Sequence, residues 1–194
     1  MLKTHAFLSV GLTLWLLAAE PVAQAEPVAV TGFTHVKSLG GIDEYRLEAN
    51  GLTVLIKPDH SAPVATFQVT YHVGSRNEVT GTTGATHILE HMMFKGSEHY
   101  NKPAANGVDQ YLGKVGAHFN ATTSYDRTNY FATLGRDSLE GYIAIEADRM
   151  RELWLHEADR QKEMTVVRNE FERQENNPIS ALNKEVRATA YLAK

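Results

Sequence analysis

The chain has 194 residues, 43% hydrophobic and 22% charged, which is typical of an ordinary globular protein. Its formal net charge is −4 and it contains no basic block, which argues against nucleic acid as a partner. Because cysteine is absent, the chain has no disulfides and no lipobox cysteine, and any metal must be held by histidines and carboxylates.

The first residues have the pattern of a secretory signal peptide. Lys3 supplies a positive start, Phe7 to Ala19 is mostly apolar, and Ala23-Gln24-Ala25 is the small-x-small pattern that a signal peptidase accepts. The apolar run is shorter than the about 20 residues that span a bilayer, so a stable membrane span is not expected. We therefore predict that residues 1–25 are removed and that the protein is exported, to a bacterial periplasm or to the medium.

The next part of the chain predicts a lead-in followed by strands. Residues 26–41 are expected to be a loose lead-in segment, and a domain is expected over residues 42–194. Residues 44–48 and 52–56 flank Asn50-Gly51, which favours a hairpin with a type I′ turn. Strict alternation of apolar and polar residues over 65–73 predicts a half-buried strand.

The rest of the chain alternates between helical and strand-like segments. We expect helices within residues 84–96 and over about 107–115, followed by strands at 117–124 and 128–134. A capping box at Asp137 and Glu140 predicts a helix that runs to Trp154. Two more helices are expected, one over 157–175 and a last one from Ile179. Since the strands come as hairpins, we predict an α+β fold, mostly antiparallel with helices packed on one face of the sheet. The last helix shows no stop signal before Lys194, so we expect the domain to be truncated there.

Three ionisable side chains lie in the apolar stretch from Gly84 to Gly96. His87 and His91 are four residues apart, and Glu90 lies between them. On a helix these three share a face about 100° wide, since each residue turns by about 100°. Two imidazoles one turn apart are able to bind one metal ion, and the glutamate beside them is placed to take a proton from a water on that metal as the water attacks a carbonyl.

An ordinary helix with two surface histidines is the alternative. The neighbouring apolar residues argue against it, because they are expected to pack inward and leave little room for unused charge. These residues are Ile88, Leu89, Met92 and Met93. We therefore predict a metal site, and catalytic zinc needs a third protein ligand and an open position.

The residues alone leave the third ligand open. The candidates by type are Glu163, Glu170, Glu172, His99 and His118. Glu163 and Glu170 are seven residues apart and point within about 20° of each other on a helix. They border an expected buried stripe of Met164, Val167 and Phe171, although an exposed acidic stripe is an equally good interpretation.

His-x-x-Glu-His is the inverted zincin motif, and longer blocks make the resemblance specific. The blocks GSRNE, GTTGATHILEHMMFKGSEHY, GAHFNATTSYDRTNYF and RQKEMTVVRNEFERQENNP resemble signatures of the insulinase/pitrilysin family of zinc metallopeptidases, from about residue 44 onward. Thr86 departs from it, because the family usually has a small apolar residue there. The resemblance implies one Zn²⁺ per domain held by His87, His91 and Glu170, with Glu90 as general base and Glu163 as a second, non-ligand glutamate that supports catalysis.

The resemblance also assigns a role to the block AHFNATTS. In the family this is an edge strand to which the substrate peptide adds as a further strand, with Asn120 and the backbone at Ala121 meeting the scissile region. An ordinary strand is the simpler interpretation of these residues, although asparagine is a poor strand former. His118 shares a face with Asn120 by period-two alternation, and we expect a polar neighbour rather than a metal ligand.

The sequence therefore predicts an exported zinc endopeptidase that cleaves internal bonds of peptides or unfolded segments. The rival from another class is a non-catalytic partner subunit of a two-chain processing peptidase, although inactive members typically lose the motif that this chain keeps. A purely structural zinc site is weaker, because Glu90 would have no task. The resemblance further implies a related domain, downstream or on a separate chain, that closes over the substrate.

Overall fold

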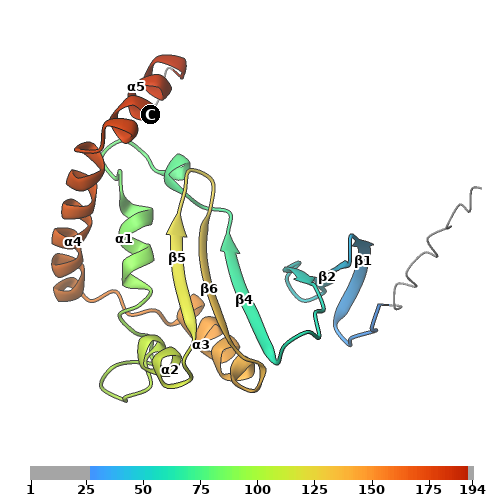
Figure 1. Ribbon diagram of the computed structural model, residues 1–194. Helices are drawn as coiled ribbons and strands as arrows, with labels where there is room; N and C mark the ends of the chain where they lie inside the picture. Colours follow the sequence, from blue (N-terminus) through green and yellow to red (C-terminus); the bar gives the residue numbers. More distant parts are fainter. Residues whose placement is uncertain (1–26, 192–194) are drawn as a thin grey trace, which may run out of the picture. The chain divides into compact units, whose positions relative to one another are not determined.

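The computed structural model describes residues 27–191, so the predicted signal peptide lies outside the described residues. The chain divides into two compact units, the first ending at His60 and the second beginning at Ser61 (Figure 1). In chain order the elements are β1 (Phe33–Leu39), β2 (Ile42–Leu47), β3 (Thr53–Ile56), β4 (Val64–Tyr71), η1 (Ser75–Asn77), α1 (Ala85–Met92), α2 (Val108–Lys114), β5 (His118–Thr123), β6 (Thr128–Gly135), η2 (Arg136–Ser138), α3 (Leu139–Arg151), α4 (Glu157–Glu175) and α5 (Pro178–Ala190). The domain boundary predicted at residue 42 stays a prediction.

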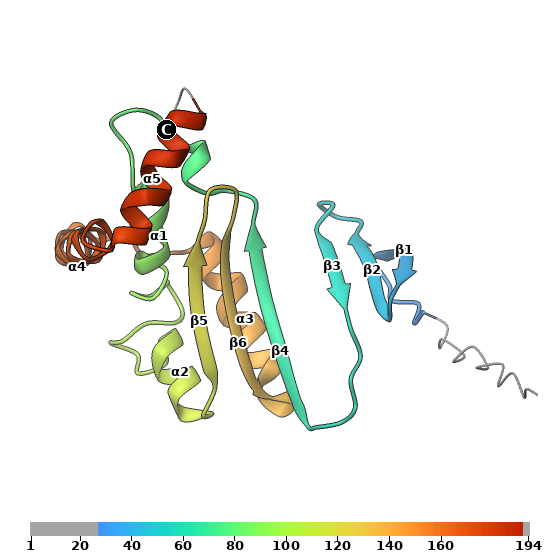
Figure 2. The same cartoon turned by 45° about the horizontal axis from the view of Figure 1, so that its top comes forward.

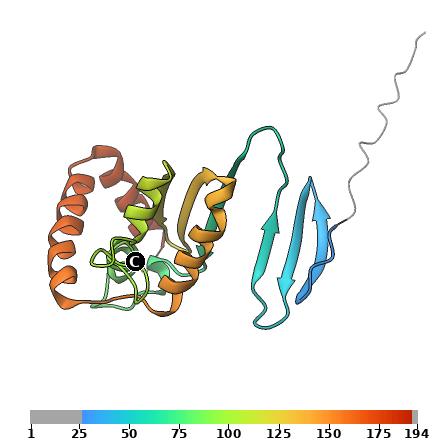
Figure 3. The same ribbon diagram turned by 90° about the horizontal axis from the view of Figure 1, so that it is seen from below.

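The first unit is a meander of three antiparallel strands, β1-β2-β3 (Figure 3). The prediction of a loose lead-in over residues 26–41 is wrong for its second half, because β1 pairs with β2 along its length. The pairing shifts between His35 and Lys37. Such an irregularity breaks the period of two by which a strand is recognised in a sequence.

The predicted hairpin is present, but its turn differs. Leu47 and Leu52 close the loop through a hydrogen bond of 2.8 Å from the Leu47 N–H to the Leu52 carbonyl. A type I′ turn requires positive φ at both central residues. Gly51 has a φ of 77°, whereas Ala105 is the one non-glycine residue with positive φ in the part of the chain that the structure describes. Asn50 instead accepts a hydrogen bond from the Leu52 N–H through its side chain.

The second unit contains the sheet β4-β6-β5, antiparallel throughout, with β5 at one edge. One face carries apolar side chains from all three strands, and helices α2 and α3 pack against it around Leu112, Ala132 and Tyr142. Figure 2 shows α3 behind this sheet. The other face is mostly polar, with Thr66 and Thr133 hydrogen-bonded across it. The α+β prediction, with helices packed on one face, is confirmed.

Helix α1 is fastened at both ends. Glu78, buried in the loop before it, accepts hydrogen bonds of 2.9 Å from the N–H groups of Gly84 and Thr86, which lie at the helix N-terminus. Beyond its other end, the carbonyl of Met93 accepts from Arg149, which is itself buried and paired with Glu146. These contacts fix the helix to the loop and to α3.

Three predictions about helix ends need correction. The capping box at Asp137 and Glu140 is wrong, because α3 begins at Leu139 after a 3-10 turn and its N-cap, Ser138, makes no side-chain capping bond. The same helix ends at Arg151, before Trp154. The predicted last helix also ends earlier than expected, at Ala190, with Tyr191 in extended conformation. Its start is capped by the Asn177 side chain.

The predicted burial of two apolar stripes is only partly correct. Met92 at the end of α1 and the following Met93 are buried, but Leu89 on the helix is exposed. On α4, Met164 and Phe171 are 38% and 52% exposed, and the buried residue of this helix is Glu163. Across the described residues 27–191, the helices are too short or too polar to cross a membrane.

We predict that Glu78→Gln lowers the free energy of unfolding by about 2 kcal/mol, because it replaces a buried, charged acceptor of two N–H bonds with a neutral one. The exposed Glu172→Gln on α4 is the control and should change stability little. Urea denaturation of both variants measures the difference. Equal stability of the two would show that the carboxylate of Glu78 does not hold the start of α1.

Candidate metal centre

Helices α1 and α4 lie beside each other and bring three metal-binding side chains together. His87 and His91 project from α1 and Glu170 from α4, and one ligand atom from each lies within 4.8 Å of the others. Glu170 Oε2 is 3.4 Å from His87 Nε2 and 3.6 Å from His91 Nε2. Among the described residues, this is the group of histidine and acidic side chains that has metal-binding geometry.

The spacing of Glu170 from the two histidines is that of ligands of one zinc ion. With bonds of about 2.1 Å to histidine nitrogen and carboxylate oxygen, two ligands of a tetrahedral ion lie about 3.4 Å apart. The two measured N–O distances match this value. The side chains of His87 and Glu170 are each 33% exposed and that of His91 is 19% exposed, so the centre is open on one side. Two imidazoles and one carboxylate would leave a fourth position free.

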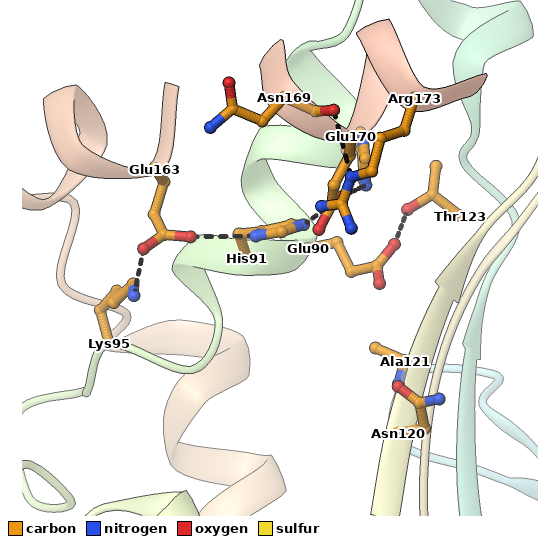
Figure 4. A network of polar contacts seen from close by, with 11 residues as sticks. Glu90, His91, Lys95, Asn120, Ala121, Thr123, Glu163, Asn169, Glu170 and Arg173 are labelled. Atoms are coloured by element: carbon orange, nitrogen blue, oxygen red, sulfur yellow. Dashed lines mark hydrogen bonds and ion pairs between the residues drawn. The ribbon is translucent and has the colours of Figure 1, made fainter. Parts of the chain in front are cut away.

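Glu90 stands apart from the three donors. It projects from α1 toward the edge strand β5, where the hydroxyl of Thr123 donates a hydrogen bond to Glu90 Oε2 (Figure 4). One oxygen of the carboxylate is therefore held by the sheet. A carboxylate fixed in this way beside a metal centre is arranged to accept a proton, which is the chemistry of a general base.

Glu163 contacts His91 but is not one of the three donors. Its Oε2 lies 2.9 Å from His91 Nδ1, on the ring edge away from Glu170, and its Oε1 is paired with Lys95 (Figure 4). Burial alone would raise the pKa of Glu163, but the hydrogen bonds from Lys95 and His91 outweigh it and hold the pKa below its usual value. Glu163 is therefore the acidic partner of a candidate ligand, His91, an arrangement that orients the ring.

The other candidates for the third ligand lie elsewhere. His99 is paired with Asp148 at 2.7 Å, which raises the pKa of His99. His118 is exposed on β5 and Glu172 is exposed on α4. Of the five residues considered from the sequence, Glu170 and Glu163 are the two that reach the histidine pair, and they do so in different ways.

Asn120 and Ala121, predicted to bind substrate, lie in the edge strand β5 near Glu90 (Figure 4). Asn120 is exposed, whereas Ala121 is buried against the apolar side of the sheet. The amide oxygen of Asn120 accepts a hydrogen bond of 2.9 Å from the Ala121 N–H. The edge position predicted for this strand is confirmed within the sheet of the second unit.

Sequence reasoning missed two residues of the centre. Lys95 follows His91 by four positions, the spacing of neighbours on a helix face, but α1 ends at Met92. Thr123 follows Ala121 by two positions, so strand alternation places both on the side of the sheet that faces the helices. Both signals are present in the sequence. Their partners, Glu163 and Glu90, are distant along the chain and are not indicated by any local pattern.

Comparison with known proteins gives consistent matches. The model of one peptidase family, Insulinase (Peptidase family M16), matches residues 53–194. The zinc protease PqqE of Helicobacter pylori is 35% identical over 145 residues, which is 74% of this chain and 32% of that protein. The probable mitochondrial-processing peptidase subunit beta of Arabidopsis thaliana is 30% identical over 142 residues, 73% of this chain and 26% of that protein.

A solved structure also matches this chain. The crystal structure of a protease from Helicobacter pylori superposes with a TM-score of 0.66 at 35% identity, covering 74% of this chain and 34% of that one. The chain thus spans about a third or less of the length of the curated relatives named above.

We predict that Glu170→Ala removes bound Zn²⁺ because a ligand is lost, whereas Glu163→Ala still binds it with affinity lower by about 10- to 100-fold. Zinc content after dialysis, measured by atomic absorption, separates the two. Glu172→Ala on the same helix is the matched control and should bind zinc normally. The reverse pattern would mean that the roles of the two glutamates are exchanged.

Proposed function

The chain belongs to the insulinase family of peptidases, family M16, and on that premise we propose that it is the zinc-binding part of an endopeptidase. The reaction is hydrolysis of internal bonds in peptides or unfolded segments. The observation that supports this most is the convergence of His87, His91 and Glu170 within 4.8 Å, with Glu90 on the same helix as the histidines. A centre that is open on one side and flanked by a fixed carboxylate suits hydrolysis better than a closed structural site.

The proposed roles follow from where each side chain lies. A Zn²⁺ held by His87, His91 and Glu170 would supply a Lewis acid that polarises the scissile carbonyl and acidifies water. Glu90 accepts the proton of the attacking water and passes it to the leaving amine. Thr123 holds one oxygen of Glu90, which fixes the position of the carboxylate next to the edge strand β5.

We propose that the substrate adds to β5 as a further strand. The support is that β5 is an edge strand of its sheet and that Thr123, at its end, contacts Glu90. Pairing through the backbone tolerates many side chains, so this mode suits a peptidase of broad specificity. Asn120 and the backbone of Ala121 are the proposed contacts near the scissile bond.

The next prediction separates an enzyme from a non-catalytic partner subunit. Glu90→Gln should keep zinc, because this side chain is not a ligand, and lower kcat by about 1,000-fold or more, because the general base is lost. His91→Ala should instead lower zinc content. Peptide hydrolysis by the full-length protein, with zinc measured in parallel, tests this. Full activity in zinc-loaded Glu90→Gln would contradict the role of Glu90, and an inactive zinc-loaded wild type would favour the partner subunit.

We further propose that a homologous domain, on the same chain or a separate one, closes over the peptide. The chain spans 32% of the Helicobacter pylori relative, and its metal-binding side chains are partly exposed. We expect residues 27–194 alone to bind Zn²⁺ but to hydrolyse peptides at least about 100-fold more slowly than the same residues together with the homologous domain, since positioning and exclusion of water would be incomplete. Equal kcat/KM for the two would remove the need for a second domain.

We also propose export, to a bacterial periplasm or to the medium. The support is the charged start, apolar run and small-x-small site within residues 1–25. After fractionation of the producing cells, N-terminal sequencing of the mature protein should read from Glu26. A soluble protein that retains Met1 would contradict this proposal.

A further inference from the structure

Lys95 lies just beyond the end of α1 and has no role in the proposed reaction. Its side chain is 26% exposed, and its ammonium group is paired with Glu163 Oε1 (Figure 4). Glu163 comes from α4, so this ion pair joins the segment that follows the metal-binding helix to the helix that carries Glu170. Surface ion pairs contribute little to stability, but the Glu163 side chain is only 11% exposed. A carboxylate so far from solvent needs a fixed positive partner.

The second oxygen of Glu163 determines the state of His91. An ionised carboxylate only accepts hydrogen bonds, so the ring nitrogen 2.9 Å from Glu163 Oε2, Nδ1, must carry the hydrogen. In the neutral ring the other nitrogen, Nε2, then has a free lone pair. Nε2 is the atom that lies 3.6 Å from Glu170 Oε2, on the side where the donors converge. A ring in the opposite tautomer would present a hydrogen to the metal instead.

We propose that Lys95 is a positioning residue that holds the Glu163 carboxylate with Oε2 toward His91, and thereby fixes the tautomer and orientation in which His91 presents Nε2 to zinc. Without Lys95, Oε1 loses its partner and the carboxylate is free to turn toward solvent. An unrestrained imidazole populates both neutral tautomers, so part of the protein would have to change tautomer before binding metal. The identity of the metal rests on the proposed function, whereas the tautomer concerns the metal-free protein.

The decisive measurement is made on the metal-free, full-length protein labelled with ¹⁵N-histidine. Spectra at about pH 8, above the ordinary histidine pKa of about 6.5, distinguish a protonated Nδ1 from a protonated Nε2. His91→Gln assigns the signal. We expect His91 of the wild type to carry its hydrogen on Nδ1, and Lys95→Met to show both tautomers. Lys95→Arg, which keeps the cation, should restore the wild-type spectrum.

The affinity for Zn²⁺ itself, from competition with a chelator, gives a second readout. Lys95→Met should bind Zn²⁺ about 10- to 100-fold more weakly, as is usual when a partner of a ligand is lost, and Lys95→Arg should recover most of this. Lys162→Met is the matched control, because Lys162 precedes Glu163 in the sequence but is exposed and makes no ion pair within the described part of the chain. If Lys95→Met acted through a general loss of structure, its thermal unfolding would change. The spectral change would then not be confined to His91.

Each outcome bears on the proposal. An Nε2-protonated His91 in the wild type overturns it even if Lys95→Met fails to fold, and so does a folded Lys95→Met with unchanged tautomer and zinc affinity. If the tautomer and affinity follow Lys95 but the zinc-loaded wild type hydrolyses no peptide, the proposed function fails and the role of Lys95 stands. If the wild type is active and Lys95→Met resembles it in all readouts, only the role of Lys95 fails.

Discussion

Helix α1 has eight residues, and helices shorter than about 12 to 15 residues are marginal in water. It nevertheless carries the two histidines that we propose as metal ligands and the glutamate between them, whose relative positions must be held within a fraction of an ångström for that role. Stability therefore comes from outside the helix. Glu78 binds the N–H groups at its start, and Arg149 binds the carbonyl of Met93 beyond its end. The aromatic rings of Phe94 and Tyr130 pack against the same guanidinium group.

Helix α4 imposes the second constraint, on the orientation of the His91 ring. Glu163 and Glu170 lie two turns apart on the side of α4 that faces α1, and so they reach His91 from different directions. One meets Nδ1 and the other lies beside Nε2. Because the two contacts involve opposite edges of one ring, any rotation of His91 that improves one of them weakens the other. The packing of two helices thus specifies the orientation of a single side chain.

Local patterns predicted the elements well where the pattern was regular. The strict alternation of residues 65–73 predicted β4, and the helix predicted over 157–175 is α4. The strand β1 was missed because its pairing shifts at His35, and Phe171 was expected to be buried although it faces solvent. Residue types alone left five candidates for the third ligand. Only resemblance to a family favoured Glu170, because its distance to the histidines depends on a helix packing that no periodicity records. The contacts of Lys95 with Glu163 and of Thr123 with Glu90 are tertiary contacts of the same kind.

The hydrogen bond from the Ala121 N–H to the Asn120 side chain affects how readily the exposed edge of the sheet pairs with strands of other proteins. Exposed strand edges invite chance pairing and lead to aggregation. Here one donor of the edge is already occupied by the side chain of its own neighbour. A strand of another protein that accepts only this one hydrogen bond would replace the bond from the Ala121 N–H to Asn120, with no net gain in hydrogen bonds. A segment long enough to form several bonds at once still gains, so this contact opposes short chance pairings more than it opposes a long extended segment.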